Sequence, residues 1–206
     1  MARQTFFSFH YERDAWRAGQ VRNCNLLPTN DQHGFIDSVE WESIKRKGDD
    51  AVRRWIDDQL KGTTVTTVLI GRETAERPWV QREIMRSWNR GNGIVGMRIH
   101  GIKDQNSESD LAGPDPFDLF KLPDGALLSS VCKVHDWVLD DGRNNLGQWS
   151  ENAIEARAPY GVGDEIVYFA EPRKEAASVG VIRNLSASVG FAPRAPWCAD
   201  YVARRR

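Results

Sequence analysis

The sequence has little of what defines several large classes of protein. Its three cysteines, Cys24, Cys132 and Cys198, are scattered and odd in number, which fits free thiols better than a disulfide framework or a zinc site. No apolar run approaches the roughly 20 residues of a membrane span, and the first residues do not resemble a signal peptide. We therefore expect a cytoplasmic protein that has no membrane partner.

An excess of one charge is missing too, because 28 Lys and Arg residues nearly cancel 29 Asp and Glu residues. With no basic stripe, the sequence gives no reason to expect a nucleic-acid partner. It contains neither GxGxxG nor GxxxxGK[ST], so the dinucleotide-fold fingerprint and the P-loop are absent. Its histidines lack the HxxxH spacing of a helical zinc site, and we expect no metal and no cofactor.

The chain does contain an alternation of strand and helix patterns. Strand patterns cover residues 4–9, 35–36, 63–70, 94–99 and 127–137, and helix patterns cover 11–22, 49–60, the segment between Pro78 and Gly91, and 144–156. Such alternation predicts a doubly wound parallel sheet with helices on both faces. Ligands bind at the carboxyl ends of the strands in these sheets, so chemistry is expected just after Phe9, Asp37 and Ile70.

The composition changes near Arg157, where Ala, Gly, Pro and Arg become frequent. We therefore expect a main domain over residues 1–156 and a short C-terminal extension over 157–206. Within the extension, EIVYFA at 165–170 is apolar enough to form a strand against the core. The last residues, 204–206, are expected to be mobile.

One pair of residues is placed for chemistry beside the strand at 63–70. Trp79 and Glu83 are four positions apart on a helix, and so share a face that differs from the one carrying Val80 and Ile84. An aromatic ring and a carboxylate would then lie together at a strand end. The alternative is a surface glutamate next to a partly buried tryptophan, and the pattern alone leaves both open.

Seven blocks occur in an order typical of one family. They are FFSFHYERDAWRAGQVRN from residue 6, FIDSVEWE at 35–42, VLIGRET at 68–74, RPWVQREIMRS at 77–87, GNGIVGMRIHGIKD at 91–104, GPDPFDLF at 113–120 and VHDWVLDDGRNNLGQW at 134–149. Over about residues 3–155 the chain resembles the bacterial TIR-like domain family of Thoeris antiphage defence. The resemblance implies an α/β flavodoxin-like fold, in agreement with the strand and helix patterns.

The resemblance also implies an enzyme that cleaves NAD, an NAD nucleosidase or ADP-ribosyl cyclase that takes NAD as its substrate. Catalytic TIR domains need the Glu of a WxxxE motif to break the nicotinamide–ribose bond, and this motif falls on Trp79 and Glu83. Glu83 is thus the implied catalytic residue, acting as a carboxylate. The implied NAD-binding residues are Phe9, His10, Tyr11 and Trp79.

The family further implies a cyclic ADP-ribose-type signal that activates a separate effector protein, with a phage-derived trigger and a homo-oligomer as further partners. Arg72, Arg77 and Arg82 are candidates to support the pyrophosphate of NAD. Two other functions stay open, a non-catalytic TIR interaction module and a nucleoside or nucleotide N-glycosidase on a related fold. The presence of both Trp79 and Glu83 favours the NAD-cleaving enzyme over the module.

Overall fold

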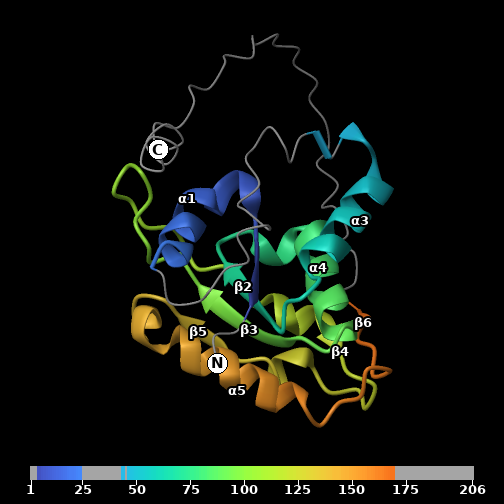
Figure 1. The fold of residues 1–206 in the computed structure, drawn as a ribbon. Helices are drawn as coiled ribbons and strands as arrows, with labels where there is room; N and C mark the ends of the chain where they lie inside the picture. Colours follow the sequence, from blue (N-terminus) through green and yellow to red (C-terminus); the bar gives the residue numbers. More distant parts are fainter. Residues whose placement is uncertain (1–3, 25–42, 45, 170–206) are drawn as a thin grey trace, which may run out of the picture. The chain divides into compact units, whose positions relative to one another are not determined.

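Among the described residues, four parallel strands form the central sheet (Figure 1). In sheet order they are β1 (Thr5–Phe9), β2 (Val65–Ile70), β3 (Gly93–Arg98) and β5 (Val134–Asp136). This computed structural model describes residues 4–24, 43–44 and 46–169. Phe9 is paired with Leu69, Leu69 with Met97, and Met97 with His135, so all four strands end at the same edge of the sheet.

Helices cover both faces of this sheet. They are α1 (Tyr11–Arg22), α3 (Asp49–Gln59), α4 (Pro78–Asn89) and α5 (Gly142–Arg157). Ala18 of α1 and Leu146 of α5 pack in one cluster with Leu69 and Met97, on one face. Val68 and Ile70 point to the opposite face and pack against α4. The predicted α/β, doubly wound parallel fold is therefore confirmed.

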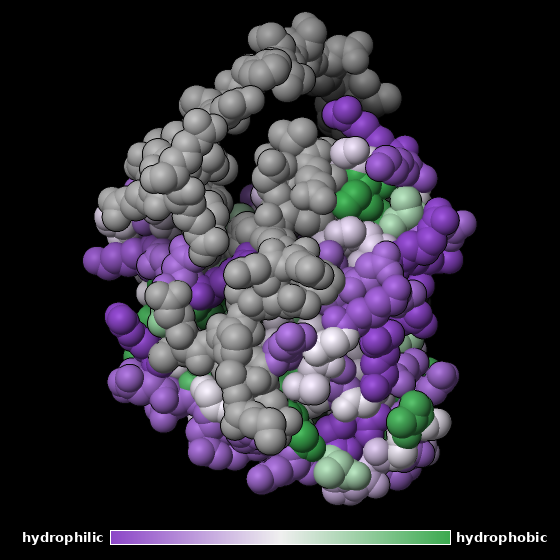
Figure 2. Space-filling model, viewed as in Figure 1, coloured by the Kyte–Doolittle hydropathy of each residue, from purple (hydrophilic) through white to green (hydrophobic). Residues whose placement is uncertain are grey.

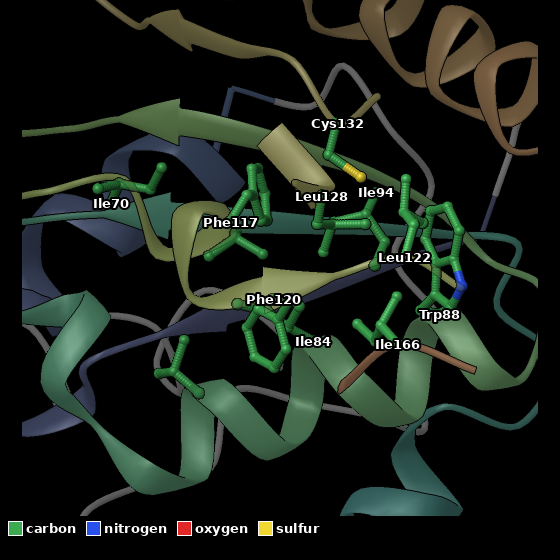
Figure 3. Close-up of a cluster of buried hydrophobic side chains, with 12 residues drawn as sticks. Ile70, Ile84, Trp88, Ile94, Phe117, Phe120, Leu122, Leu128, Cys132 and Ile166 are labelled. Carbon is green, nitrogen blue, oxygen red and sulfur yellow. The ribbon is translucent and has the colours of Figure 1, made fainter. Parts of the chain in front are cut away.

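The largest hydrophobic cluster fixes α4 against the sheet (Figure 3). Its fully buried members come from β2, α4, β3 and the segments that follow β3, and include Ile70, Ile84, Trp88, Phe117, Phe120 and Leu128. Trp88 donates its indole N–H to the carbonyl oxygen of Asp164 at 2.7 Å, and the Arg157 guanidinium lies 4.2 Å from the Trp88 ring centre. These contacts set the rotation of α4 and hence the direction of its remaining side chains.

The strand expected at 127–137 is wrong in its first half. Only Val134–Asp136 forms β5, while Leu128–Ser130 forms a 3₁₀ turn. The Ser130 hydroxyl donates to the carbonyl oxygen of Leu127 at 2.6 Å. A local bond of this kind competes with a strand ladder. The short strand expected at 35–36 lies outside the described residues.

A second, two-stranded sheet includes part of the C-terminal segment. β4 (Phe120–Lys121) pairs antiparallel with β6 (Val167–Tyr168), and the N–H of Phe169 donates to the Leu119 carbonyl oxygen at 3.1 Å. Ile166 is buried in the largest cluster. Of the strand expected at 165–170, the structure therefore forms only Val167–Tyr168 among its described residues, although Ile166 and Phe169 also contact the core. The division at residue 156 stays a prediction, and residues 204–206 lie outside the described part.

The described surface is mainly polar in the view of Figure 2, with small separated hydrophobic areas. Among the described helices, none has the length and apolar character that a bilayer crossing requires.

Candidate active site

The residues at the end of β1 and just after it pack on opposite faces of the sheet. Phe9 packs with the α1 and α5 cluster, whereas Tyr11 packs with the cluster around Phe6 on the α3 side. The Phe9 and Tyr11 ring centres are 6.0 Å apart. His10 lies between them at the start of α1 and is 9% exposed. The structure therefore brings Phe9, His10 and Tyr11 to the strand end, as their positions in the sequence predict.

Glu83 is buried between α4 and β1. Its side chain is 7% exposed, so the alternative of a surface glutamate is wrong. The sequence pattern also placed Glu83 on a different face of the helix from Val80 and Ile84. In the structure all three belong to the buried face of α4. The clusters around α3 and β2 bury a wider arc of α4 than the sequence pattern indicates.

Ser8 of β1 is the polar partner of this carboxyl. Its hydroxyl donates to Oε2 of Glu83 at 2.5 Å, and Ser8 itself is 1% exposed. Side chains alternate along a strand, so Ser8 and Phe6 face α4 while Phe7 and Phe9 face α1. The sequence did not indicate that Ser8 contacts Glu83. The available signal was a polar residue within an otherwise apolar, buried strand.

Burial controls the charge of Glu83. Removal from water raises the pKa of its carboxyl to about 8, and the hydrogen bond from Ser8 lowers that pKa only in part. The carboxyl is therefore mainly protonated at neutral pH in the described state. The resemblance implies an ionised Glu83, whereas burial favours the neutral carboxyl in the described state.

Trp79 lies one helical turn before Glu83 and is half-buried, as expected. Its ring packs against the cluster of Phe6, Val52 and Ile56, together with Tyr11. The described contacts thus place it on the α3 side of the sheet. Trp79, Tyr11 and Glu83 all lie on the face of the sheet that α4 covers.

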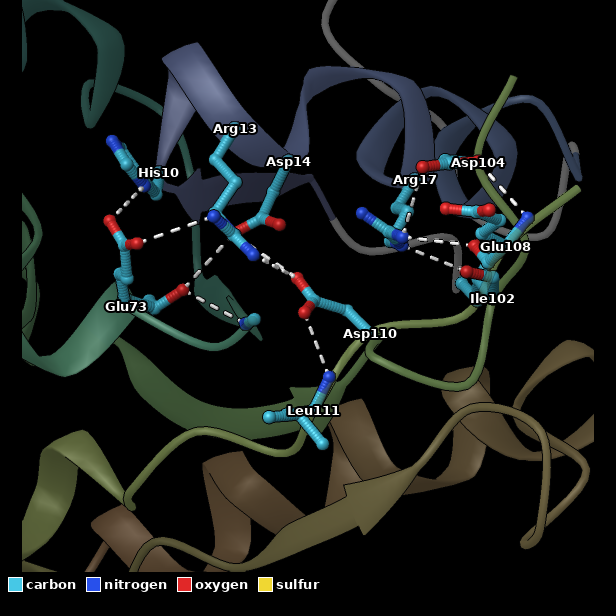
Figure 4. A network of polar contacts seen from close by, with 12 residues as sticks. His10, Arg13, Asp14, Arg17, Glu73, Ile102, Asp104, Glu108, Asp110 and Leu111 are labelled. Atoms are coloured by element: carbon cyan, nitrogen blue, oxygen red, sulfur yellow. Dashed lines mark hydrogen bonds and ion pairs between the residues drawn. The ribbon is translucent and has the colours of Figure 1, made fainter. Parts of the chain in front are cut away.

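A polar network joins three segments at this edge (Figure 4). Arg13 of α1 donates to Asp110 at 3.0 and 2.8 Å and to Glu73 at 3.3 Å, and Glu73 also pairs with Arg77. His10 Nδ1 is 4.0 Å from Oε2 of Glu73. Burial, followed by the nearby Arg77, lowers the pKa of His10, so the imidazole is neutral at physiological pH.

The three arginines proposed for the pyrophosphate differ in their placement. Arg72 is exposed, and Arg77 is already paired with Glu73. Burial lowers the pKa of Arg82, and its charged neighbours lie mainly on the α3 side. Of the three arginines, Arg72 is therefore the one that a ligand could reach most easily.

Asp14 is a second buried carboxyl that sequence reasoning missed. It is fully buried in the first turns of α1, where burial raises its pKa to about 6. Oδ2 lies 3.5 Å from the Thr74 hydroxyl, and Oδ1 has no hydrogen bond among the described residues. Gly71 leaves room for it, since a Cβ there would lie 2.2 Å from Oδ2. Asp14 therefore joins α1 to the segment after β2.

The described residues contain no cluster of three or more His, Cys, Asp or Glu side chains that could hold a metal ion. A doubly wound parallel sheet with a buried WxxxE carboxyl at its carboxyl edge defines a TIR-like α/β domain. The chain belongs to the Thoeris ThsB family of TIR-like domains. The family described as "Thoeris protein ThsB, TIR-like domain" matches residues 6–104.

A relative in Bacillus cereus (strain MSX-D12) extends this match over more of the chain. It is 34% identical over 190 residues, which cover 72% of this chain and 99% of the relative. Its name is "Putative cyclic ADP-D-ribose synthase ThsB1". The family match includes all five residues implied for the site, Phe9, His10, Tyr11, Trp79 and Glu83.

Proposed function

We propose that this protein is an NAD-cleaving enzyme of antiphage defence that releases nicotinamide and forms a cyclic ADP-ribose-type signal. The observation that carries the proposal is Glu83, a buried carboxyl of a WxxxE helix that is hydrogen-bonded to β1 near the strand end. Membership of the ThsB family and the name of the B. cereus relative, a cyclic ADP-D-ribose synthase, support the reaction.

The chemistry requires one well-placed carboxylate. The bond between the ribose C1′ and the nicotinamide nitrogen breaks, and both electrons go to that nitrogen, so nicotinamide leaves neutral. The ribose then takes on oxocarbenium character, as in glycoside cleavage. An ionised Glu83 stabilises this positive charge and binds the ribose hydroxyls. No strong general acid is needed, because the leaving ring already carries a positive charge.

The nucleophile decides the product. An adenine nitrogen or a ribose hydroxyl of the same molecule gives a cyclic ADP-ribose isomer, whereas water gives ADP-ribose. The burial of Glu83 favours the intramolecular route, because a catalytic carboxyl that is shielded from water leaves less water to compete for the reacting carbon. We assign cyclisation as the main reaction and hydrolysis as a side reaction.

The residues around Glu83 take the roles of binding groups in this proposal. Phe9, Tyr11 and Trp79 offer aromatic faces for the nicotinamide or adenine ring. The start of α1, at His10, offers backbone N–H groups to the pyrophosphate, because helix N-termini attract anions. The reaction needs NAD as substrate and no additional cofactor or metal.

The signalling context is also part of the proposal. The cyclic nucleotide diffuses to a separate effector protein and activates it, and a phage-derived trigger or assembly into a homo-oligomer turns the enzyme on. The cytoplasm, which supplies NAD, is the proposed location.

The main rival is a non-catalytic TIR module that works through homotypic contacts. Such a module gains nothing from Glu83, because a buried carboxyl lowers folding stability at neutral pH. Perturbed buried carboxyls are concentrated at functional sites instead. A nucleoside N-glycosidase would also use a carboxylate, and it is separated from the proposed enzyme by the identity of the released base.

The test compares NAD turnover by the parent, Glu83→Gln and the control Glu155→Gln, whose side chain is exposed on α5. Mass spectrometry follows nicotinamide, ADP-ribose and cyclic isomers, with purified protein and in phage-infected cells. We expect nicotinamide and a cyclic isomer from the parent and the control, and neither from Glu83→Gln. A fully active Glu83→Gln variant would overturn the role of Glu83. Infected cells that keep their NAD and form no cyclic nucleotide would favour the interaction module.

A further inference from the structure

Burial and strand pairing fix the position of the Ser8 hydroxyl. It lies within β1, where its backbone is paired with Val68 of β2. The side chain is 1% exposed and faces α4, on the same side of the strand as Phe6. Its hydroxyl therefore occupies a fixed position 2.5 Å from Oε2 of Glu83.

The closest ion pair between α4 and α3 does not involve Glu83. Arg86 binds Asp57 of α3 through two hydrogen bonds of 2.7 and 2.6 Å. The charges that act on the pKa of Arg82 are those of Arg53, Asp57 and Asp49 on α3 and of Arg86 on α4. Among the described residues, burial and the Ser8 hydroxyl are the two causes that set the pKa of Glu83.

We propose that Ser8 is the positioning residue of Glu83, whose Oε2 it holds so that Oε1 meets the ribose of NAD. This inference rests on the proposed NAD-cleaving function. Ser8 acts through the carboxyl and does not touch the substrate. It fixes one oxygen of a side chain that would otherwise rotate about its last bonds.

The same hydrogen bond favours the reactive form of the carboxyl. A hydroxyl donates more strongly to an ionised oxygen than to a neutral one, so Ser8 stabilises the carboxylate. The substrate adds to this effect, because the nicotinamide ring of NAD carries a positive charge. Ser8 and NAD together bring Glu83 to the ionised state that bond cleavage needs.

The variants that test this role are Ser8→Ala, which removes the hydroxyl, and Ser8→Thr, which keeps one. The matched control is Ser87→Ala. Ser87 is also a buried serine at the contact of α4 with the sheet, but its hydroxyl pairs with Thr66 at 2.8 Å and not with Glu83. Loss of a buried strand–helix hydrogen bond is therefore common to both alanine variants.

We expect Ser8→Ala to lower kcat about ten-fold to a hundred-fold, as for loss of a hydrogen bond to a charged group, with KM for NAD changed less than about three-fold. The acid limb of the pH–rate profile moves to higher pH, and Ser8→Thr restores most of kcat. Ser87→Ala keeps the profile of the parent. A change in KM alone, or equal losses in Ser8→Ala and Ser87→Ala, would contradict the positioning role.

A second measurement does not depend on turnover. Carbon-13 NMR of the glutamate carboxyls gives the pKa of Glu83 directly, with Glu83→Gln identifying its resonance. Ser8→Ala raises that pKa if the proposal holds, and an unchanged pKa refutes it. Activity retained by Glu83→Gln would instead remove the proposed function itself, so the two failures are distinguishable.

Discussion

Replacing Glu83 by glutamine is expected to abolish NAD cleavage and to stabilise the fold, relative to the parent, increasingly as the pH rises toward 8. The substitution keeps the size of the side chain and removes its charge. Ser8 can still donate its hydroxyl to the amide oxygen, so the main packing and the hydrogen bond survive. What disappears is the free energy spent on keeping an ionisable group buried.

The magnitude follows from the pKa of Glu83, which is about 8 in the folded protein and 4.5 for an unperturbed glutamate. Because the folded-state pKa is raised, the proton stabilises the folded state fully below pH 4.5, and this stabilisation is lost as the pH rises to 8. At pH 7 the loss spans 2.5 pH units, or about 3 kcal/mol. Burying the amide N–H₂ without a partner costs about 1–3 kcal/mol, but that cost does not depend on pH.

Urea unfolding at a series of pH values from 5 to 8 measures this effect. The stability of Glu83→Gln relative to the parent should rise by about 3–4 kcal/mol from pH 5 to pH 8. Glu155→Gln, whose side chain is exposed, should run parallel to the parent. If Glu83→Gln also runs parallel to the parent, Glu83 is not buried as a neutral acid and this reasoning fails.

Three further substitutions test the rest of the site. Trp79→Ala should lower NAD turnover and destabilise the protein by roughly 2–4 kcal/mol, because its ring is half-buried; a urea midpoint equal to that of the parent would contradict this. Asp14→Asn should stabilise the protein by up to about 3 kcal/mol at pH 7 and progressively less from pH 6 down to pH 4, because the pKa of Asp14 is raised to about 6; urea unfolding at these pH values shows whether the gain fades. Gly71→Ala places a Cβ 2.2 Å from the Asp14 carboxyl and should lower stability by about 1–3 kcal/mol or more, and an unchanged Tm would show that this carboxyl can move aside.

Much of the fold was predictable because its elements carry strong local signals. The β-branched run ending at Ile70 forms β2, and the helix predicted at 11–22 has those bounds in the structure. The segment 127–137 was less predictable. Its apolar residues indicate burial, but side-chain to backbone bonds at Ser130 decide between strand and turn, and composition does not reveal them.

The site was predictable in part. Trp79 and Glu83 were found through helical spacing and the family motif, and the structure does place Glu83 beside the strand end. Ser8 and Asp14 were missed for a different reason. Ser8 is 75 positions from Glu83, and Asp14 is 60 from Thr74, so each contact exists only after the sheet has formed. Local patterns also do not fix the rotation of α4, which the packing of Trp88 determines.

Two of the buried carboxyls, Glu83 and Asp14, connect stability to function. Both Glu83 and Asp14 have raised pKa values, and burial is the first cause in each case. Asp14 lies near Arg13 and Arg17, which favour its ionised form, and its role is explained by joining α1 to the segment after β2. Glu83 has the Ser8 hydroxyl as its hydrogen-bond partner, and among the described residues no nearby charge contributes to its raised pKa. Glu83 therefore weakens the fold at neutral pH and has a fixed hydrogen-bond donor. Both properties fit the proposed site, which must stabilise a developing positive charge.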